Sequence, residues 1–193
     1  LAAAILSLAN PSFAQDPGKS VSAKAAAVAR AMDNAMTPGD YQKRLEPMIG
    51  NFDVRVLIWV DPGKPPIETS ASAVSVWVLG NRFVQTMLVG GPSADAFNAI
   101  GYIGYDNAAK AYQAAWMDDG STAMTLYSGN FNPDGKSATM KASIVNASTG
   151  KPTPLELRMS LGANGGHVTQ LWGKGLGTKM FKMMELQYTR TKP

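Results

Sequence analysis

The stretch that decides the fold runs from Asn51 to Val89 and reads NFDVRVLIWVDPGKPPIETSASAVSVWVLGNRFVQTMLV. Phe52, Val54 and Val56 are apolar, and the residues between them are charged. An apolar side chain at every second position predicts a strand with one face turned to a core. The segment DPGKPP then turns the chain into a second strand over 67–79. Gly80-Asn81 predicts a two-residue hairpin turn into a third strand over 82–89.

The same alternation continues to the end of the chain, with turn-forming segments such as DNAAK and NPDGK between the apolar runs. It predicts seven further strands, over 97–105, 111–118, 123–131, 138–145, 155–161, 167–172 and 179–190. Each connection is too short for a helical crossover, so we expect all ten strands to pair antiparallel with their neighbours.

A ten-stranded meander exposes two strand edges unless the sheet closes on itself. We therefore predict a mainly β fold, an antiparallel up-and-down barrel, with a two-sheet β-sandwich as the alternative. Side chains alone do not fill a barrel wider than eight strands, so we expect this one to enclose a cavity.

Two helices are expected before the first strand. Residues 24–36 are rich in alanine and carry Val28, Met32 and Met36 at helical spacing. A shorter helix is predicted from an N-cap at Thr37, with Pro47 and Gly50 at its end. These helices are expected to plug one end of the barrel.

The N-terminal residues have the pattern of a secretory signal. An apolar run over 1–8 is broken by Pro11, and Ser12-Phe13-Ala14 provides small residues before a cleavage site. We expect cleavage after Ala14 and a periplasmic or secreted protein, with residues missing before Leu1. The expected domains are a signal remnant over 1–14, a leader and helix over 15–36 and one β-barrel over 37–193.

Composition excludes several classes of function. The chain has no cysteine, which excludes a catalytic thiol, a thiolate metal site and an iron–sulfur cluster. The net charge is +4, and the basic residues are scattered, so nucleic acid is not expected as a partner. No run after the signal is long and apolar enough to cross a membrane as a helix.

The chain has one histidine, His167, which excludes a site built on several histidines. Its neighbours Gly165 and Gly166 predict a glycine-rich turn with a solvated imidazole. We therefore expect no bound haem, no other cofactor and no metal, and we assign no catalytic residue.

Six segments together resemble a known family: MIGNFDV, VWVLGNRFVQ, GYIGYDNAAKAYQAAWMDDGSTAM, GNFNPDGKSATM, STGKP and FKMMELQYTR. They are similar to secreted bacterial proteins grouped as domain of unknown function 1579, over residues 37–190. That family is similar to calycin-type (lipocalin-like) barrels, so the resemblance implies a calycin-like barrel. It implies no established activity, substrate or cofactor.

The hairpin Gly101–Asp119, GYIGYDNAAKAYQAAWMDD, is the richest in aromatic and acidic residues. With a five-residue turn at 106–110, Gly104 lies opposite Tyr112, and Tyr102, Tyr112, Trp116 and Asp118 share one face. The ligand-binding residues predicted from this face and the neighbouring hairpin are Trp77, Arg82, Tyr102, Tyr112, Trp116 and Asp118. The alternatives are a core tryptophan with a solvated aspartate, or a reversed hairpin whose Ala99, Gly101, Ile103 and Ala115 line the interior.

Three hypotheses follow. The first is a protein that binds a small, largely apolar molecule inside the barrel. The second is a structural or interaction protein with a filled barrel, in which the chain's eleven methionines fill gaps. The third is an enzyme that uses carboxylates and arginines inside the barrel. The sequence does not indicate the oligomeric state.

Overall fold

The computed structural model describes residues 22–191 except 148, 163, 176 and 178. The expected cleavage site after Ala14 lies outside the described residues. The chain divides into two units between Asn34 and Ala35, and each is described by itself. α1 (Ala23–Met36) confirms the predicted alanine-rich helix, and none of its residues is buried.

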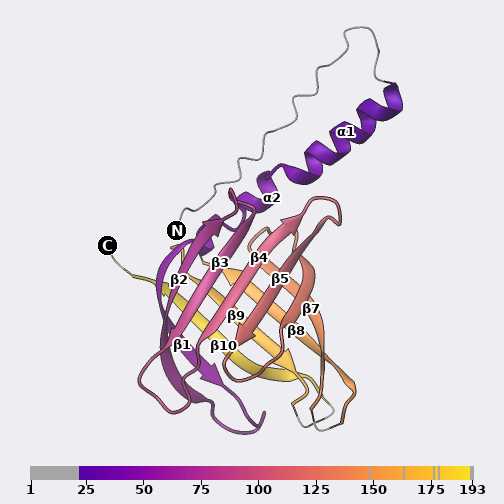
Figure 1. Ribbon diagram of the computed structural model, residues 1–193. Coiled ribbons are helices and arrows are strands. Elements are labelled where there is room, and N and C mark those ends of the chain that lie inside the picture. Colours follow the sequence, from indigo (N-terminus) through magenta and orange to yellow (C-terminus); the bar gives the residue numbers. More distant parts are fainter. Residues whose placement is uncertain (1–21, 148, 163, 176, 178, 192–193) are drawn as a thin grey trace, which may run out of the picture. The chain divides into compact units, whose positions relative to one another are not determined.

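The second unit is mainly β and closes into a barrel in which every pair of neighbouring strands is antiparallel (Figure 1). This confirms the predicted fold class. The strands are β1 (Gly50–Ile58), β2 (Ile67–Val78), β3 (Phe83–Gly90), β4 (Ala99–Asp106), β5 (Ala111–Asp118), β6 (Thr125–Phe131), β7 (Ser137–Val145), β8 (Pro152–Leu161), β9 (His167–Gly173) and β10 (Phe181–Arg190). β1 pairs with β10, so the described sheet has no free edge strand.

The short predicted helix divides into two pieces, α2 (Asp40–Lys43) and the 3-10 helix η1 (Glu46–Met48). The N-cap is Gly39, so the N-cap predicted at Thr37 was wrong. Gln42 Oε1 instead accepts a hydrogen bond of 2.7 Å from the Gly39 amide.

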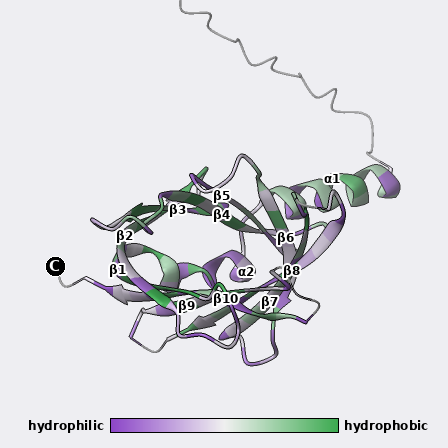
Figure 2. Cartoon of the chain, turned by 90° about the horizontal axis from the view of Figure 1, so that it is seen from below, coloured by the Kyte–Doolittle hydropathy of each residue, from purple (hydrophilic) through white to green (hydrophobic). Residues whose placement is uncertain are grey.

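The α2–η1 segment plugs one end of the barrel, as predicted for the second of the two expected helices, whereas α1 has no buried residue. Leu45, in the link between the two helices, is fully buried, and Met48 is almost so. Both pack with Val84 of β3, Tyr112 of β5 and Met159 of β8. Figure 2, seen from the opposite end, shows α2 within the ring of strands. We call this the capped end, and the other the open end.

The two ends also differ in their connections. At the capped end the strands are joined by turns of four or five residues, whereas the open-end loops have six to eight. The turn after β2 has four residues, Leu79 to Arg82, and Leu79, Gly80 and Asn81 all have positive φ. The predicted two-residue turn at Gly80-Asn81 is therefore too short.

Candidate functional site

The hairpin β4–β5 has a register one residue away from the predicted one. Tyr105 pairs with Tyr112, Gly104 with Gln113 and Gly101 with Trp116. Asp106 belongs to the ladder, where it pairs with Ala111, so the turn has four residues and not five. Because side chains alternate along a strand, this shift moves the β4 residues to the opposite face relative to β5.

The shift separates the predicted site residues. Tyr112, Trp116 and Asp118 share the inward face of β5 and lie beside Ala99, Gly101 and Ile103 of β4. Tyr102 lies on the outer face, where its hydroxyl accepts a 2.6 Å hydrogen bond from Gln85 Nε2. The expectation that Tyr102 lines the interior with the other aromatic residues was therefore wrong.

Trp116 is held in place from two sides. Its ring lies across Gly101, where an added Cβ would come within 3.0 Å of the indole. Its Nε1 donates a 2.9 Å hydrogen bond to Asp118 Oδ2, and the Gly120 amide donates to Asp118 Oδ1 at 3.1 Å. Both carboxylate oxygens are thus engaged, and they fix the indole near the end of β5 that faces the open end.

Towards the open end, some inward residues that neighbour one another across the strands are partly exposed to solvent. Trp116 is inward, and the ladder places Leu157, Leu171 and Met184 on the inward face, paired in that order from β8 to β10. Other inward residues there, such as Leu88 and Leu155, are buried. Among the partly exposed inward residues of the middle and open part of the barrel are Ala114, Trp116, Ala142, Leu157, Thr169, Leu171 and Met184. We call them the lumen wall. Solvent reaches part of each of these inward side chains, and most of them also pack against the buried clusters.

At the capped end Tyr112 packs tightly against the plug. Tyr112 is 1% exposed, and its hydroxyl donates a 2.7 Å hydrogen bond to the Tyr41 carbonyl. Burial raises the pKa of Tyr112 to about 12. Tyr41 stacks on Tyr105 with ring centroids 4.3 Å apart. Tyr112 is therefore a core residue that anchors α2.

Trp77 and Arg82 also lie at the capped end. The Trp77 indole donates a 2.8 Å hydrogen bond to Glu46 Oε2 of η1. Arg82 donates to the Leu79 carbonyl of its own turn at 3.1 Å and to the Met36 carbonyl at 2.8 Å. Both side chains connect the barrel to residues that precede β1. Trp77 is inward like Asp118 but lies at the opposite end of the barrel, and Arg82 lies in the turn after β2.

His167 is buried and not solvated, contrary to the expectation from its glycine neighbours. It is 4% exposed and stacks on Tyr188 with centroids 4.0 Å apart, while Phe52 meets the ring edge to face. Its Nδ1 is the one buried side-chain nitrogen or oxygen of the described residues without a hydrogen-bond partner. Burial, with a smaller effect from Arg190, lowers the pKa of His167 to about 4, so the imidazole is neutral at pH 7.

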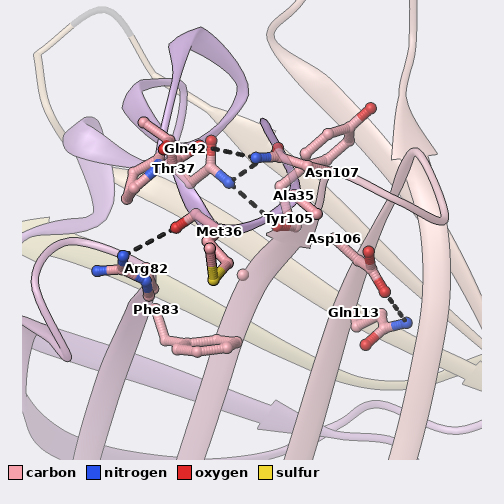
Figure 3. A pocket seen from close by; sticks show the side chains of 12 residues that line it. Ala35, Met36, Thr37, Gln42, Arg82, Phe83, Tyr105, Asp106, Asn107 and Gln113 are labelled. Carbon is pink, nitrogen blue, oxygen red and sulfur yellow. Dashed lines mark hydrogen bonds between the residues drawn. The ribbon is translucent and has the colours of Figure 1, made fainter. Parts of the chain in front are cut away.

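A pocket of about 350 Å³ lies beside α2 and the end of β4 (Figure 3). Its polar side chains are already used. Gln42 Nε2 donates to the Tyr105 carbonyl at 3.0 Å and to Asn107 Oδ1 at 3.2 Å, and Asn107 Nδ2 donates to the Thr37 carbonyl. The pocket therefore lies between residues 35–42 and the capped end of β3, β4 and β5.

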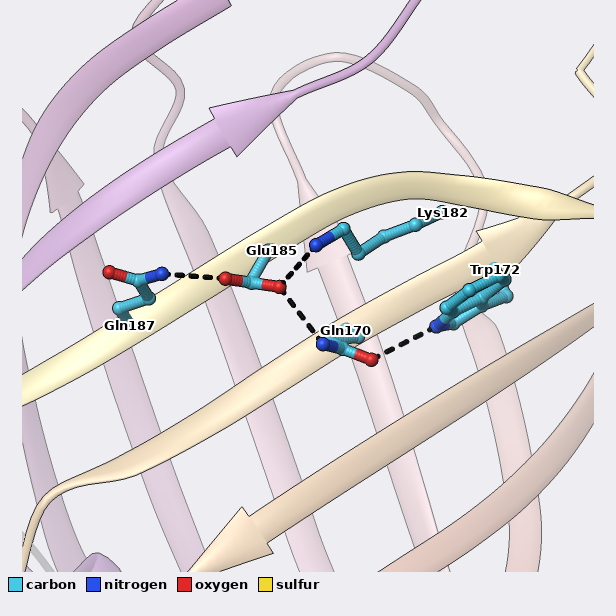
Figure 4. A network of polar contacts seen from close by, with 5 residues as sticks. All are labelled: Gln170, Trp172, Lys182, Glu185 and Gln187. Carbon is cyan, nitrogen blue, oxygen red and sulfur yellow. Dashed lines mark hydrogen bonds and ion pairs between the residues drawn. The ribbon is translucent and has the colours of Figure 1, made fainter. Parts of the chain in front are cut away.

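A polar network covers the outer face of β9 and β10 (Figure 4). Glu185 accepts hydrogen bonds from Lys182 at 2.6 Å, Gln187 at 2.6 Å and Gln170 at 2.9 Å. Desolvation raises the pKa of Glu185, but these three donors outweigh it and the pKa is lowered. Gln170 also accepts from the Trp172 indole, so the donors and acceptors are matched within the network.

The described residues contain no group of three or more histidine, cysteine, aspartate or glutamate side chains that could hold a metal ion. None of the described helices is long and apolar enough to span a membrane. The arrangement that remains is an apolar wall with one hydroxyl, from Thr169, and an anchored Trp116–Asp118 pair on the inward face of β5.

Sequence reasoning missed most of this wall. Leu157, Thr169 and Leu171 were not among the predicted residues, although the alternation of β8 and β9 could have identified them. Glu156 and Arg158 are charged, so Leu155, Leu157 and Met159 form the opposite, inward face of β8. The ladder then carries that face on to Thr169 and Leu171.

The fold defines a class: a closed, ten-stranded antiparallel barrel with one plugged end. The chain belongs to the DUF1579 family of proteins of unknown function, whose sequence profile matches residues 37–190.

Comparison with solved structures agrees with this fold. The crystal structure of Rv2717c from M. tuberculosis is similar to this chain with a TM-score of 0.59 and 14% identity, over 81% of this chain and 100% of that chain. At this level of identity the similarity concerns the fold alone. No curated protein matches the chain.

Proposed function

We propose that the protein binds a small, largely apolar molecule in the barrel interior. This molecule would enter the barrel at the open end. The observation that carries this proposal is the partial exposure of inward-facing apolar side chains at the lumen wall, above all Leu157 and Leu171. Both are inward and partly exposed, whereas the inward residues Met140 and Val84 are fully buried.

The chemistry of the wall supports an apolar ligand with few polar groups. Aliphatic side chains, Met184 and the Trp116 ring supply apolar surface that a ligand would shield from water. Thr169 offers one hydroxyl for a hydrogen bond. Asp118 already accepts two hydrogen bonds, so its role is to orient the Trp116 ring.

The longer loops at the open end support entry from that side. Loops supply binding residues and can move while the sheet beneath them stays rigid. At the capped end, in contrast, Leu45 and Met48 are buried among strand residues.

The alternatives from the sequence have less support. A filled structural barrel does not account for the partly exposed wall. An enzyme with arginines inside the barrel loses Arg158, which lies on the outer face and stacks over Trp172 at 4.2 Å from the ring centre. We also propose that the protein acts outside the cytoplasm, because residues 1–14 have the pattern of a secretory signal that ends at Ala14.

The proposal is tested with N-phenyl-1-naphthylamine, a neutral apolar probe that fluoresces when shielded from water. Ala142 is inward and part of the lumen wall, whereas the next residue, Ser143, is outward and exposed. Ala142→Phe places a ring in the proposed site, and Ser143→Phe places the same ring outside.

We expect the wild type and Ser143→Phe to bind the probe equally, and Ala142→Phe to bind it at least tenfold more weakly. Circular dichroism and unfolding curves confirm that both variants fold. Equal binding by the two folded variants, or no saturable binding by the wild type, would refute a ligand site in the lumen.

A further inference from the structure

The outer face of the strands from β2 to β6 is unusually apolar. Six aliphatic or methionine side chains on it are between 39% and 64% exposed: Val74, Val76, Met87, Val89, Ile100 and Leu126. Isolated exposed apolar residues are normal on a protein surface, but a contiguous group marks an interaction site.

The strand register places five of the six in two neighbouring rows, and Val89 lies two residues beyond Met87 on the same face of β3. Val74 pairs with Met87, Met87 with Ile100 and Ile100 with Met117, so one apolar row crosses four strands. The next row begins at Val76 on β2 and ends at Leu126 on β6. Paired residues in neighbouring strands lie about 5 Å apart, so the rows form one surface. We call it the apolar flank.

The apolar flank carries no charge in either row. Its polar members are satisfied locally, because Gln85 Nε2 donates a 2.6 Å hydrogen bond to the Tyr102 hydroxyl. Burial of this pair against a partner would therefore leave no broken hydrogen bond between the two side chains.

The outer face of β8, β9, β10 and β1 is different. It carries the ion pairs Glu156–Arg158 and Lys182–Glu185, and Arg55 of β1 pairs with Glu68 at the start of β2. Ion pairs are thus concentrated on this side of the barrel, whereas the two rows of the apolar flank carry no charged residue.

We propose that the apolar flank is the interface of a homodimer, in which a second copy of this chain packs flank against flank. A charge-free surface fits a partner surface without charge, and the chain itself supplies one. A twofold axis places the same residues on both sides, so no unpaired charge would be buried.

The geometry of the sheet suits this contact. A closed barrel has no free strand edge to extend, so two copies can meet only face to face. Sheets packed in this way lie about 10 Å apart, and interdigitated aliphatic side chains fill the space between them.

The size of the flank indicates a modest affinity. The flank spans five strands about 4.8 Å apart and, from Gln85 to Val89 of β3, about 14 Å along the strands, or about 340 Å² per copy and about 700 Å² in the pair. Standard specific interfaces are larger, so we expect a weak dimer that forms at high protein concentration.

Sedimentation equilibrium over a range of concentrations tests the proposal with two matched substitutions. Val74→Lys introduces a charge into the first row of the flank. Val145→Lys introduces the same charge at a valine of β7 that is also well exposed, at 69%, but lies outside the flank. We expect the wild type and Val145→Lys to dimerise, and Val74→Lys to dimerise at least tenfold more weakly.

A wild type that stays monomeric at several hundred micromolar would overturn the proposal, as would equal effects of the two substitutions. Sedimentation of a monomeric wild type with neutral phosphatidylcholine vesicles would assign the flank to a lipid surface and also overturn it.

Methionine oxidation provides a second measurement that needs no variant. Met87 lies in the flank and is 50% exposed, whereas Met124 lies in an open-end loop and is 58% exposed. With dilute peroxide, oxidation of Met87 should slow at high protein concentration relative to Met124. A constant ratio across the concentration range would contradict the dimer.

Discussion

The capped and open ends of the barrel are built from the same strands but differ in their connections and in what covers them. At the capped end, Tyr112 packs in one buried cluster with the plug residues Leu45 and Met48, and His167 stacks on Tyr188 of a second buried cluster. At the open end, the strands continue with the same alternation, but longer loops connect them and no segment plugs them. Leu157 and Leu171 there remain partly exposed.

The alternation of side chains along a strand determines whether each one points inward or outward. Its burial also depends on other elements, such as the α2–η1 segment that covers the capped end. The plug supplies Leu45 and Met48, which fill space that strand side chains alone would leave. Stability is therefore expected to depend on the capped end, and ligand binding on the open end.

The largest expected effect is a difference in the free energy of unfolding between alanine substitutions at two leucines, one at each end of the barrel. Leu45→Ala removes a fully buried side chain of the plug and should lower the free energy of unfolding by about 3 kcal/mol. Leu171→Ala in the partly exposed lumen wall should cost about 1 kcal/mol, because water already reaches that site. Urea unfolding at pH 7 measures both. Equal losses would mean that the two ends are packed alike.

Acid should destabilise the capped end through His167. Burial lowers its pKa to about 4 in the folded protein, from the ordinary histidine value of 6.5. The unfolded chain therefore binds the proton more readily between these values, and stability is lost as pH falls from 6.5 towards 4. The loss should be on the order of 3 kcal/mol.

His167→Phe keeps an aromatic ring between Phe52 and Tyr188 but cannot titrate. Urea unfolding at pH 7 and pH 4.5 should show a smaller acid effect for this variant than for the wild type. If both lose the same stability on acidification, the buried imidazole is not the cause.

A smaller effect is expected from the Trp116–Asp118 pair on the inward face of β5. Trp116→Phe keeps an apolar ring but removes the 2.9 Å hydrogen bond to Asp118, at a cost of about 1 kcal/mol. The same variant should lose most of the change in tryptophan fluorescence that accompanies binding of N-phenyl-1-naphthylamine. A change of undiminished size in Trp116→Phe would place the probe near another tryptophan.

The strand pattern and the closure of the sheet could be predicted because both follow from local sequence. Period two identifies the strands, short turns make them antiparallel, and unpaired edges favour closure. The register of β4–β5 was missed by one residue. Asp106 remains in the ladder, its carboxylate accepts hydrogen bonds from the Ala108 and Ala109 amides, and Lys110 adopts a positive φ of 53°. Sequence gives little warning of positive φ at a lysine.

The candidate site was predicted only in part, because burial depends on residues that are distant in the chain. Trp116 and Asp118 were found from their own hairpin. The burial of His167 depends on Phe52 and Tyr188, from strands that the sequence cannot place around it. Tyr112 was chosen for its aromatic ring, but the plug covers it.

The central claim, that a ligand occupies the interior at the open end, is tested most directly by methyl NMR during titration with N-phenyl-1-naphthylamine. The methyl groups of Ala114, Leu157 and Leu171 report on the lumen wall. The methyl groups of Leu45 and Ala138 report on the capped end. The account predicts saturable shifts of the first group with little change in the second. Shifts confined to the capped end, or to outward methyl groups such as that of Ala115, would contradict it.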